Sequence, residues 1–149
     1  MKIFKIKLEI FIAVFVILTT DLAAHEYKIG NLKILHPYII ETPSGAVVAG
    51  GYMKIVNTSN QFDRLNAVVV KFAESSKIHE MKMENDVMKM REVKGGLKIP
   101  AHGSVELKQG GYHIMFMNII KSMTAGETYE GILFFEKSGN IKVLFSVEE

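Results

Sequence analysis

Histidine and methionine side chains dominate the chemistry that this sequence offers. Seven of the nine methionines fall between Met81 and Met123, with His79 two residues before that stretch and His113 within it. His79-Glu80-Met81 and His113-Ile114-Met115 each place a histidine two residues before a methionine. Because positions i and i+2 of a β-strand point to the same face, each pair can offer an imidazole nitrogen and a thioether sulfur to one ion.

This donor set favours Cu(I). A thioether is neutral and soft, so it binds Cu(I) well and Zn(II), Mg(II) or Ca(II) poorly. The sequence contains no cysteine, which excludes a blue-copper site, because that site needs a thiolate, and also excludes disulfides. The residue types leave a second interpretation open, since methionine packs irregular gaps well. The same methionines could fill the core of a structural or adhesive β-domain.

The remaining histidines are secondary candidates. If a signal peptide is cleaved after Ala24, the amine and imidazole of His25 could chelate Cu(II), and a copper-dependent redox enzyme using His25 is a third hypothesis. The alternative for His25 is a frayed terminus. We expect His36 and His102, beside turns, to face solvent, although His102 could gate the site if its loop folds over it. No nucleophile elbow or catalytic acid–base pair stands out, so we expect no enzyme.

The elements that must position these residues are predicted to be β-strands separated by short Gly-, Asn- and Pro-containing turns. Ser122 to Glu127 could form one helical turn. Many short strands at short intervals indicate a single all-β domain, an antiparallel sandwich or barrel. The strands are expected over residues 27–35, 47–56, 65–72, 77–83, 87–93, 105–107, 112–120, 128–135 and 141–147.

Residues 1–24 have the three parts of a secretory signal peptide: three lysines, an apolar run from Ile10 to Leu18, and small residues at Ala23-Ala24. The apolar run is about half of the roughly 20 residues that a membrane-spanning helix needs. We therefore expect cleavage, no stable membrane insertion, and a periplasmic mature domain over residues 25–149. Because no cysteine follows the apolar run, we also expect no lipid anchor.

The predicted mature domain is nearly neutral. It contains 15 Lys and Arg against 14 Asp and Glu, a net charge of +1. A nucleic-acid-binding domain needs a basic face, so this balance argues against nucleic acid as a partner. A chain of about 125 residues is long enough to hold a fold by its hydrophobic core alone.

The stretch from Ile78 to Met117 resembles the periplasmic copper chaperones called PCu(A)C. Short matching segments outside this stretch extend the resemblance to nearly the whole mature chain. The segment from His36 to Ile40 departs from the pattern, because the family usually has a Trp-Ala-Arg-like segment there, and this bears on the choice of partner. The matching pieces are His79-Glu80-Met81, Val87 to Arg91, Gly95-Gly96-Leu97, Ile99-Pro100-Ala101, Leu107 to Met117, Pro43, Gly51 to Asn57, Asp63-Arg64-Leu65 and Leu133 to Glu136.

This resemblance implies a cupredoxin-like (Greek-key) β-sandwich that binds one Cu(I) per chain at an exposed site. The family's two histidine and two methionine ligands map onto His79, Met90, His113 and Met115. Ten residues separate His79 from Met90, as in the family, and 22 separate Met90 from His113, within a residue of the family spacing. The resemblance further implies a carrier and not an enzyme. Its partners would be an oxidase subunit or a Sco-like protein, contacted transiently during cytochrome c oxidase assembly, and we expect a monomer.

Four methionines are surplus to such a four-ligand site. Met81 is the best candidate for a substitute ligand, because it follows His79 at the i+2 position. Met83 or Met88 could be a first contact for incoming copper, and Met117 is expected to pack in the core.

Overall fold

The computed structural model describes residues 25–149, and this part of the chain consists of β-strands and turns without a helix. No helix of these residues is long and apolar enough to span a membrane. The predicted signal peptide lies outside the described residues. The strands are β1 (Glu26–Ile29), β2 (Leu32–Ile40), β3 (Val48–Asn57), β4 (Asp63–Val70), β5 (Ala73–Glu84), β6 (Val87–Glu92), β7 (Leu97–Ile99), β8 (Gly103–Leu107), β9 (Tyr112–Ile119), β10 (Thr128–Phe135) and β11 (Gly139–Glu148).

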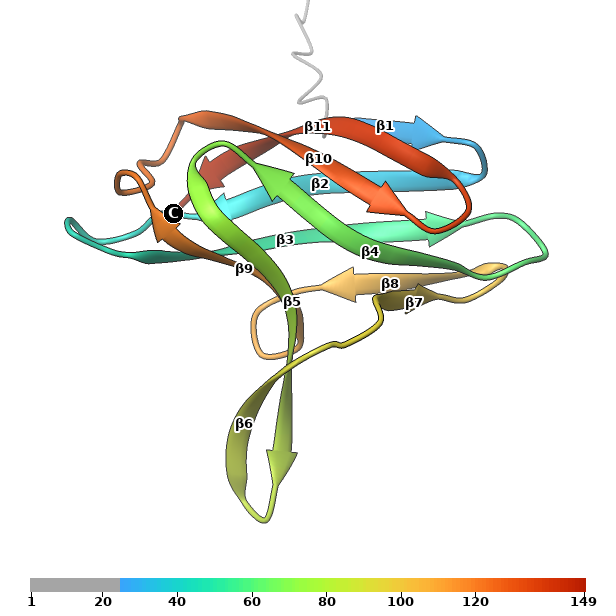
Figure 1. Ribbon diagram of the computed structural model, residues 1–149, viewed down its shortest axis with the longest axis horizontal. Coiled ribbons are helices and arrows are strands. Elements are labelled where there is room, and N and C mark those ends of the chain that lie inside the picture. The colour runs from blue at the N-terminus through green and yellow to red at the C-terminus, as the bar shows by residue number, and fades with distance from the viewer. Residues whose placement is uncertain (1–24) are drawn as a thin grey trace, which may run out of the picture.

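These strands form one hydrogen-bonded sheet that folds over a core. The strand order is β6-β5-β9-β8-β3-β2-β11-β10-β4-β7, with β1 added to β2 and a further pairing of β9 with β3. β7 stands at one end of this order and β3 near the middle of it, yet the two strands are in contact. The β5–β6 hairpin extends away from the body that the other strands make (Figure 1).

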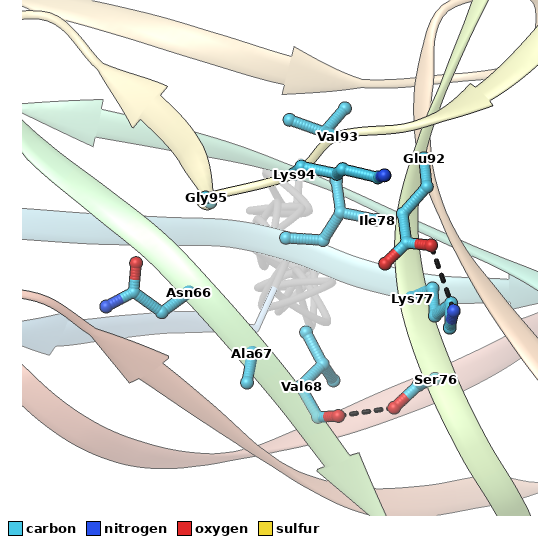
Figure 2. A pocket seen from close by; sticks show the side chains of 11 residues that line it. Asn66, Ala67, Val68, Ser76, Lys77, Ile78, Glu92, Val93, Lys94 and Gly95 are labelled. Carbon is cyan, nitrogen blue, oxygen red and sulfur yellow. Dashed lines mark hydrogen bonds and ion pairs between the residues drawn. The ribbon is translucent and has the colours of Figure 1, made fainter.

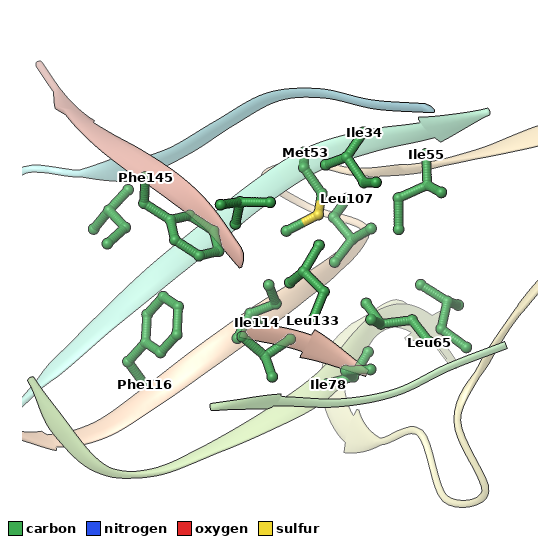
Figure 3. Close-up of a cluster of buried hydrophobic side chains, with 14 of the residues drawn as sticks. Ile34, Met53, Ile55, Leu65, Ile78, Leu107, Ile114, Phe116, Leu133 and Phe145 are labelled. Carbon is green, nitrogen blue, oxygen red and sulfur yellow. The ribbon is translucent and has the colours of Figure 1, made fainter. Parts of the chain in front are cut away.

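The core is a cluster of buried aliphatic and aromatic side chains contributed by strands from both halves of the sheet (Figure 3). Ile114 and Phe116 of β9 are fully buried in it. Because side chains alternate along a strand, His113 and Met115 point to the opposite face of β9. The packing of β9 on the core thus sets the direction in which its histidine and methionine point.

The predicted all-β single domain is confirmed, with local differences. The pairings of β2 with β11 and of β8 with β9 are parallel, and the other pairings of residues 25–149 are antiparallel. Residues 27–35 are not one strand, because the chain turns at Gly30, where φ is +55°. β2 instead runs on past Pro37, and its register with β3 shifts between Leu35 and Tyr38. Such a bulge accommodates a proline within a strand.

Two further differences concern short segments. Leu97–Ile99 forms β7, which the sequence did not indicate because only three residues lie between Gly95-Gly96 and Pro100. The expected helical turn at 122–127 is wrong: the chain there is irregular and ends in a turn closed by the Glu127 N–H, which donates to the Thr124 carbonyl at 3.1 Å.

Candidate metal centre

β5 and β9 place the two predicted histidines side by side. His79 and His113 are direct partners in the antiparallel register of these strands. Their ring centroids are 5.7 Å apart, with the planes at 83°. Direct partners share a face of the sheet, so both imidazoles lie on the face that points away from Ile78 and Ile114 of the core. An interaction between residues 34 positions apart thus follows from strand pairing alone.

The two predicted methionine ligands lie on the same face. Met115 follows His113 by two residues on β9, and Met90 on β6 is the partner of Met81 on β5. The Nδ1 atom of His79 lies 3.1 Å from the Sδ atom of Met90. Met90, His113 and Met115, together with Met81, line one open cavity of about 370 Å³. All four sequence-predicted site residues are therefore brought together at the β6-β5-β9 end of the sheet.

The opposite wall of this cavity comes from β3 and the loop before it, and sequence reasoning missed it. Gly50 is the pairing partner of Met115, and a Cβ atom at Gly50 would come within 2.5 Å of the Tyr52 hydroxyl oxygen. The absence of a side chain at Gly50 thus lets Tyr52 lie over the cavity. The remaining wall residues are Ile40, Glu41, Thr42, Val48, Ala49, Gln109 and Gly110. The Gly50-Gly51 pair within an apolar strand was the available signal, because glycine inside a strand marks a close approach.

The surroundings of the two imidazoles bear on how each could bind a metal. His113 is buried, and its Nδ1 lies 3.1 Å from the Gly111 carbonyl oxygen. A carbonyl can only accept, so this contact needs a proton on Nδ1, and the neutral ring with that tautomer has the Nε2 lone pair free for a metal. Burial lowers the pKa of the His79 imidazole, and the neighbouring His113 and Lys77 lower it further against the opposing effect of Glu92. A lowered pKa favours the uncharged imidazole of His79, which is the form that binds a metal.

The donor set fits a soft ion and has an open side. Within residues 25–149, no group of three or more His, Cys, Asp or Glu side chains is placed to hold a metal. The atoms that do converge are imidazole nitrogens and thioether sulfurs, which together select Cu(I) over harder ions. His113 is 5% exposed, whereas Met90 is 46% exposed. One candidate ligand is thus buried in the protein and another is accessible from solvent.

Another cavity formed by the described residues lacks these donors. It has a volume of about 450 Å³ and lies between β4, β5 and the β6–β7 connection. Its walls include the ion pair of Lys77 with Glu92 at 2.9 Å and the hydrogen bond from the Ser76 hydroxyl to the Val68 carbonyl (Figure 2). Neither histidine nor methionine lines this cavity, so its size does not make it a candidate for a soft metal.

The secondary histidines lie elsewhere. His102 precedes β8 and lines a different cavity with Lys54 and Val56, at the far end of β8 from His113, so the idea that it gates the site is wrong. His36 is half-exposed as expected, and its Nε2 lies 3.1 Å from a carboxylate oxygen of Glu148. His25 is exposed at the start of the described chain, where its carbonyl accepts from the His36 N–H at 3.2 Å.

Six of the eight methionines of residues 25–149 lie outside the buried core. Among the seven between residues 81 and 123, Met123 is buried, and outside that group Met53 is buried. Met117 is half-buried and pairs with Val48 on the face that carries Met115, so the expectation of a core position for it is wrong. Met83 and Met88 are 57% and 48% exposed. This placement contradicts the interpretation that the methionines fill the core.

Comparisons of sequence place the chain among relatives named as lipoproteins. A family model described as "Putative lipoprotein LpqE-like" matches residues 32–147. A protein of Leifsonia xyli subsp. xyli (strain CTCB07), named "Putative lipoprotein Lxx21020", is 30% identical over 119 residues, which are 80% of this chain and 70% of that protein. The present sequence contains no cysteine.

Comparisons of structure identify similar copper-related domains. The apo PCuAC domain from PmoF1 superposes with a TM-score of 0.71 at 27% identity, over 83% of this chain and 98% of that one. The copper-bound PCuAC domain from PmoF2 gives a TM-score of 0.71 at 29% identity, over 83% and 97%. The resemblance to PCu(A)C proteins and the predicted cupredoxin-like β-sandwich are confirmed.

Proposed function

The chain belongs to the LpqE-like family, and on this premise we propose that it is a metallochaperone that carries one Cu(I) ion per chain and does not act as an enzyme. The ligands in this proposal are His79, Met90, His113 and Met115. The observation that carries it is the convergence of two imidazoles and the neighbouring thioethers on one face of the β6-β5-β9 end of the sheet. The similar PCuAC domain from PmoF2 in a copper-bound form supports the choice of metal.

The proposed carrier holds copper by neutral donors and releases it by ligand exchange. The buried His113 supplies Nε2 from a ring whose orientation is fixed by the Gly111 carbonyl. Met90 stands on β6 at the outer edge of the sheet order and is exposed. A donor atom from a partner reaches the Met90 side of the ion first, and the weak thioether bond is exchanged before the histidine bonds. The charge and oxidation state of copper stay unchanged throughout.

The cellular setting forms part of the same proposal. The signal-like residues 1–24 and the lipoprotein names of the relatives support export. We place the protein in the periplasm as a monomer. Its partners are a copper donor and an acceptor, an oxidase subunit or a Sco-like protein, which it contacts transiently. The expected destination is the copper centre of cytochrome c oxidase. The near-neutral mature sequence argues against nucleic acid as a partner.

The proposal is tested by anaerobic titration of the protein with Cu(I) against a coloured Cu(I) chelator. The wild type should remove one tight equivalent from the chelator, and a His113→Ala/Met115→Ala variant should not. A His102→Ala variant is the matched control, because it removes a histidine at the other end of β8 and should bind as the wild type does. Failure of the wild type to compete with the chelator would refute the carrier function and leave the fold unaffected.

A further inference from the structure

The β5–β6 hairpin carries four methionines on a single face. In the register of the two strands, Met81 is opposite Met90 and Met83 is opposite Met88. Direct partners share a face, and so do residues two apart on one strand. We call these four residues the methionine face. Every position on this face of the hairpin between His79 and the turn at Asn85-Asp86 is therefore occupied by a thioether.

The other face of the hairpin is charged except at Val87, the partner of Glu84. The Glu84 carboxylate accepts from the Arg91 guanidinium at 2.6 Å and lies 3.3 Å from the Lys89 ammonium. Glu80 is opposite Arg91, and Lys82 is opposite Lys89. The two faces of the hairpin therefore differ in chemistry, since one is charged and hydrated and the other carries thioethers.

The methionine face does not cover a core. The hairpin extends away from the body (Figure 1), and Met83, Met88 and Met90 are 57%, 48% and 46% exposed. A strand residue chosen for packing or for strand propensity is usually β-branched or aromatic. Contiguous exposed apolar surface generally marks a site of interaction. Methionine at all four positions, in place of the residues that strands favour, indicates that this interaction requires sulfur.

The methionine face runs directly into the candidate copper centre. Successive residues on one face of a strand are about 7 Å apart, so the Met83–Met88 pair lies one step beyond the Met81–Met90 pair. Met90 already contacts Nδ1 of His79. Methionine has three rotatable side-chain bonds, which lets sulfurs on adjacent steps approach one ion. The four sulfurs thus form a continuous row from the hairpin tip to His79.

We propose that Met83 and Met88, assisted by Met81, form a second Cu(I) site made of thioethers alone, which accepts copper at the hairpin tip and passes it to the site at His79 and His113. This inference rests on the proposed carrier function. Transfer needs only exchange of one neutral ligand for another along the row, with no electron or proton moved. The thioether-only site binds more weakly than the site with two imidazoles, so copper moves inward.

The test is an anaerobic titration with Cu(I), followed through the methyl NMR signals of the methionines. The first equivalent should shift the signals of Met90 and Met115, and further copper should shift those of Met83 and Met88 with at least about tenfold weaker affinity. A Met83→Leu/Met88→Leu variant keeps the exposed face apolar and removes only the sulfurs. It should bind the first equivalent unchanged and take copper from a Cu(I)–chelator complex several-fold more slowly.

Two further variants separate this inference from the carrier function. Met117→Leu, which removes a thioether outside the hairpin, should leave both the affinity and the rate unchanged. His113→Ala/Met115→Ala should lose the tight equivalent while Met83 and Met88 still respond to copper. The inference is overturned if the signals of Met83 and Met88 do not move with copper, or if the Met83→Leu/Met88→Leu variant takes up copper as fast as the wild type. If the wild type itself did not bind one equivalent of Cu(I) tightly, the carrier function would be overturned instead.

Discussion

At the scale of the residue, the candidate centre combines one fixed donor and one accessible donor. His113 is buried, and the Gly111 carbonyl holds its ring in one tautomer. Met90 is exposed, and its sulfur faces His79 across a strand pairing. The residue types and the two His-x-Met spacings predicted a soft-metal site but left open the alternative that the methionines fill the core. They could not distinguish Met90 from Met81 as the fourth ligand, because the two are cross-strand partners whose side chains lie next to each other on the same face.

Replacing Met90 is expected to weaken Cu(I) binding more than replacing Met81. Met90→Leu should lower the affinity at least about tenfold, because even residues that only orient ligands contribute 10- to 100-fold, and Met90 is in contact with His79. Met81→Leu should have a smaller effect. Competition with a Cu(I) chelator measures both, with the core substitution Met53→Leu as the control that changes no site sulfur. A larger loss for Met81→Leu would show that Met81 is the ligand.

At the scale of the element, the β5–β6 hairpin determines whether the methionines meet the histidines. Asn85 and Asp86 form its two-residue turn, with φ angles of +50° and +61°. Two positive φ angles in succession are typical of a type I′ turn, which matches the twist of the two strands. The Glu84-Asn85-Asp86 turn was predictable from residue type. The departure of the hairpin from the body was not, because it depends on where the neighbouring strands end.

The turn residues are expected to control copper binding indirectly. Asn85→Val places a β-branched residue at positive φ and should destabilise the hairpin by about 1–2 kcal/mol. Asp86→Gly suits the same turn and should stabilise it. Hydrogen exchange of the β5 and β6 amides should become faster in the first variant and slower in the second. Copper affinity should fall in Asn85→Val alone. Equal affinity in both variants, despite altered exchange, would show that the hairpin need not be ordered for binding.

At the scale of the whole molecule, the fold presents the site by burying residues on the other side of the same strands. The sequence predicted a single all-β domain, and most strands were recognised from alternation and from turn residues. β7 and the break at Gly30 were missed, since a three-residue strand has no periodicity and the split of 27–35 depends on a turn at one glycine. The β3 wall with Gly50 and Tyr52 was missed as well, because it comes from pairing with β9 across 65 residues of sequence.

A buried carboxylate links distant parts of the sandwich. Asp63, 3% exposed at the start of β4, accepts hydrogen bonds from the N–H groups of Lys137 and Ser138 and from the Ser138 hydroxyl, at 2.9, 3.0 and 2.6 Å. Asp63→Ala leaves these donors unpaired, so the free energy of unfolding should fall by about 2–3 kcal/mol. Chemical denaturation measures the loss, with exposed Glu74→Ala as the control. An unchanged midpoint would show that water replaces the carboxylate.

Asp63 should also make stability depend on pH in the acid range. Burial raises the pKa of its carboxyl, but the hydrogen bonds from Ser138, Lys137 and Arg64 outweigh this, so the pKa falls below its usual value of 3.8. A carboxyl with a lower pKa in the folded state stabilises the fold above its unfolded-state pKa. That stabilisation should be lost as the pH falls below about 3.8 through the folded-state pKa. Unfolding free energies measured from pH 6 to pH 2 should show this loss in the wild type and less of it in Asp63→Asn.

X-ray absorption spectroscopy of the protein loaded with one equivalent of Cu(I) tests the ligand assignment most directly, because it reports which atoms are bonded to copper. The account predicts a mixed environment of imidazole nitrogen and thioether sulfur, with two of each from His79, His113, Met90 and Met115. The sulfur contribution should drop by half in Met90→Leu, and the nitrogen contribution by half in His79→Ala. Copper surrounded by sulfur alone, or by nitrogen and oxygen alone, would contradict the proposed centre.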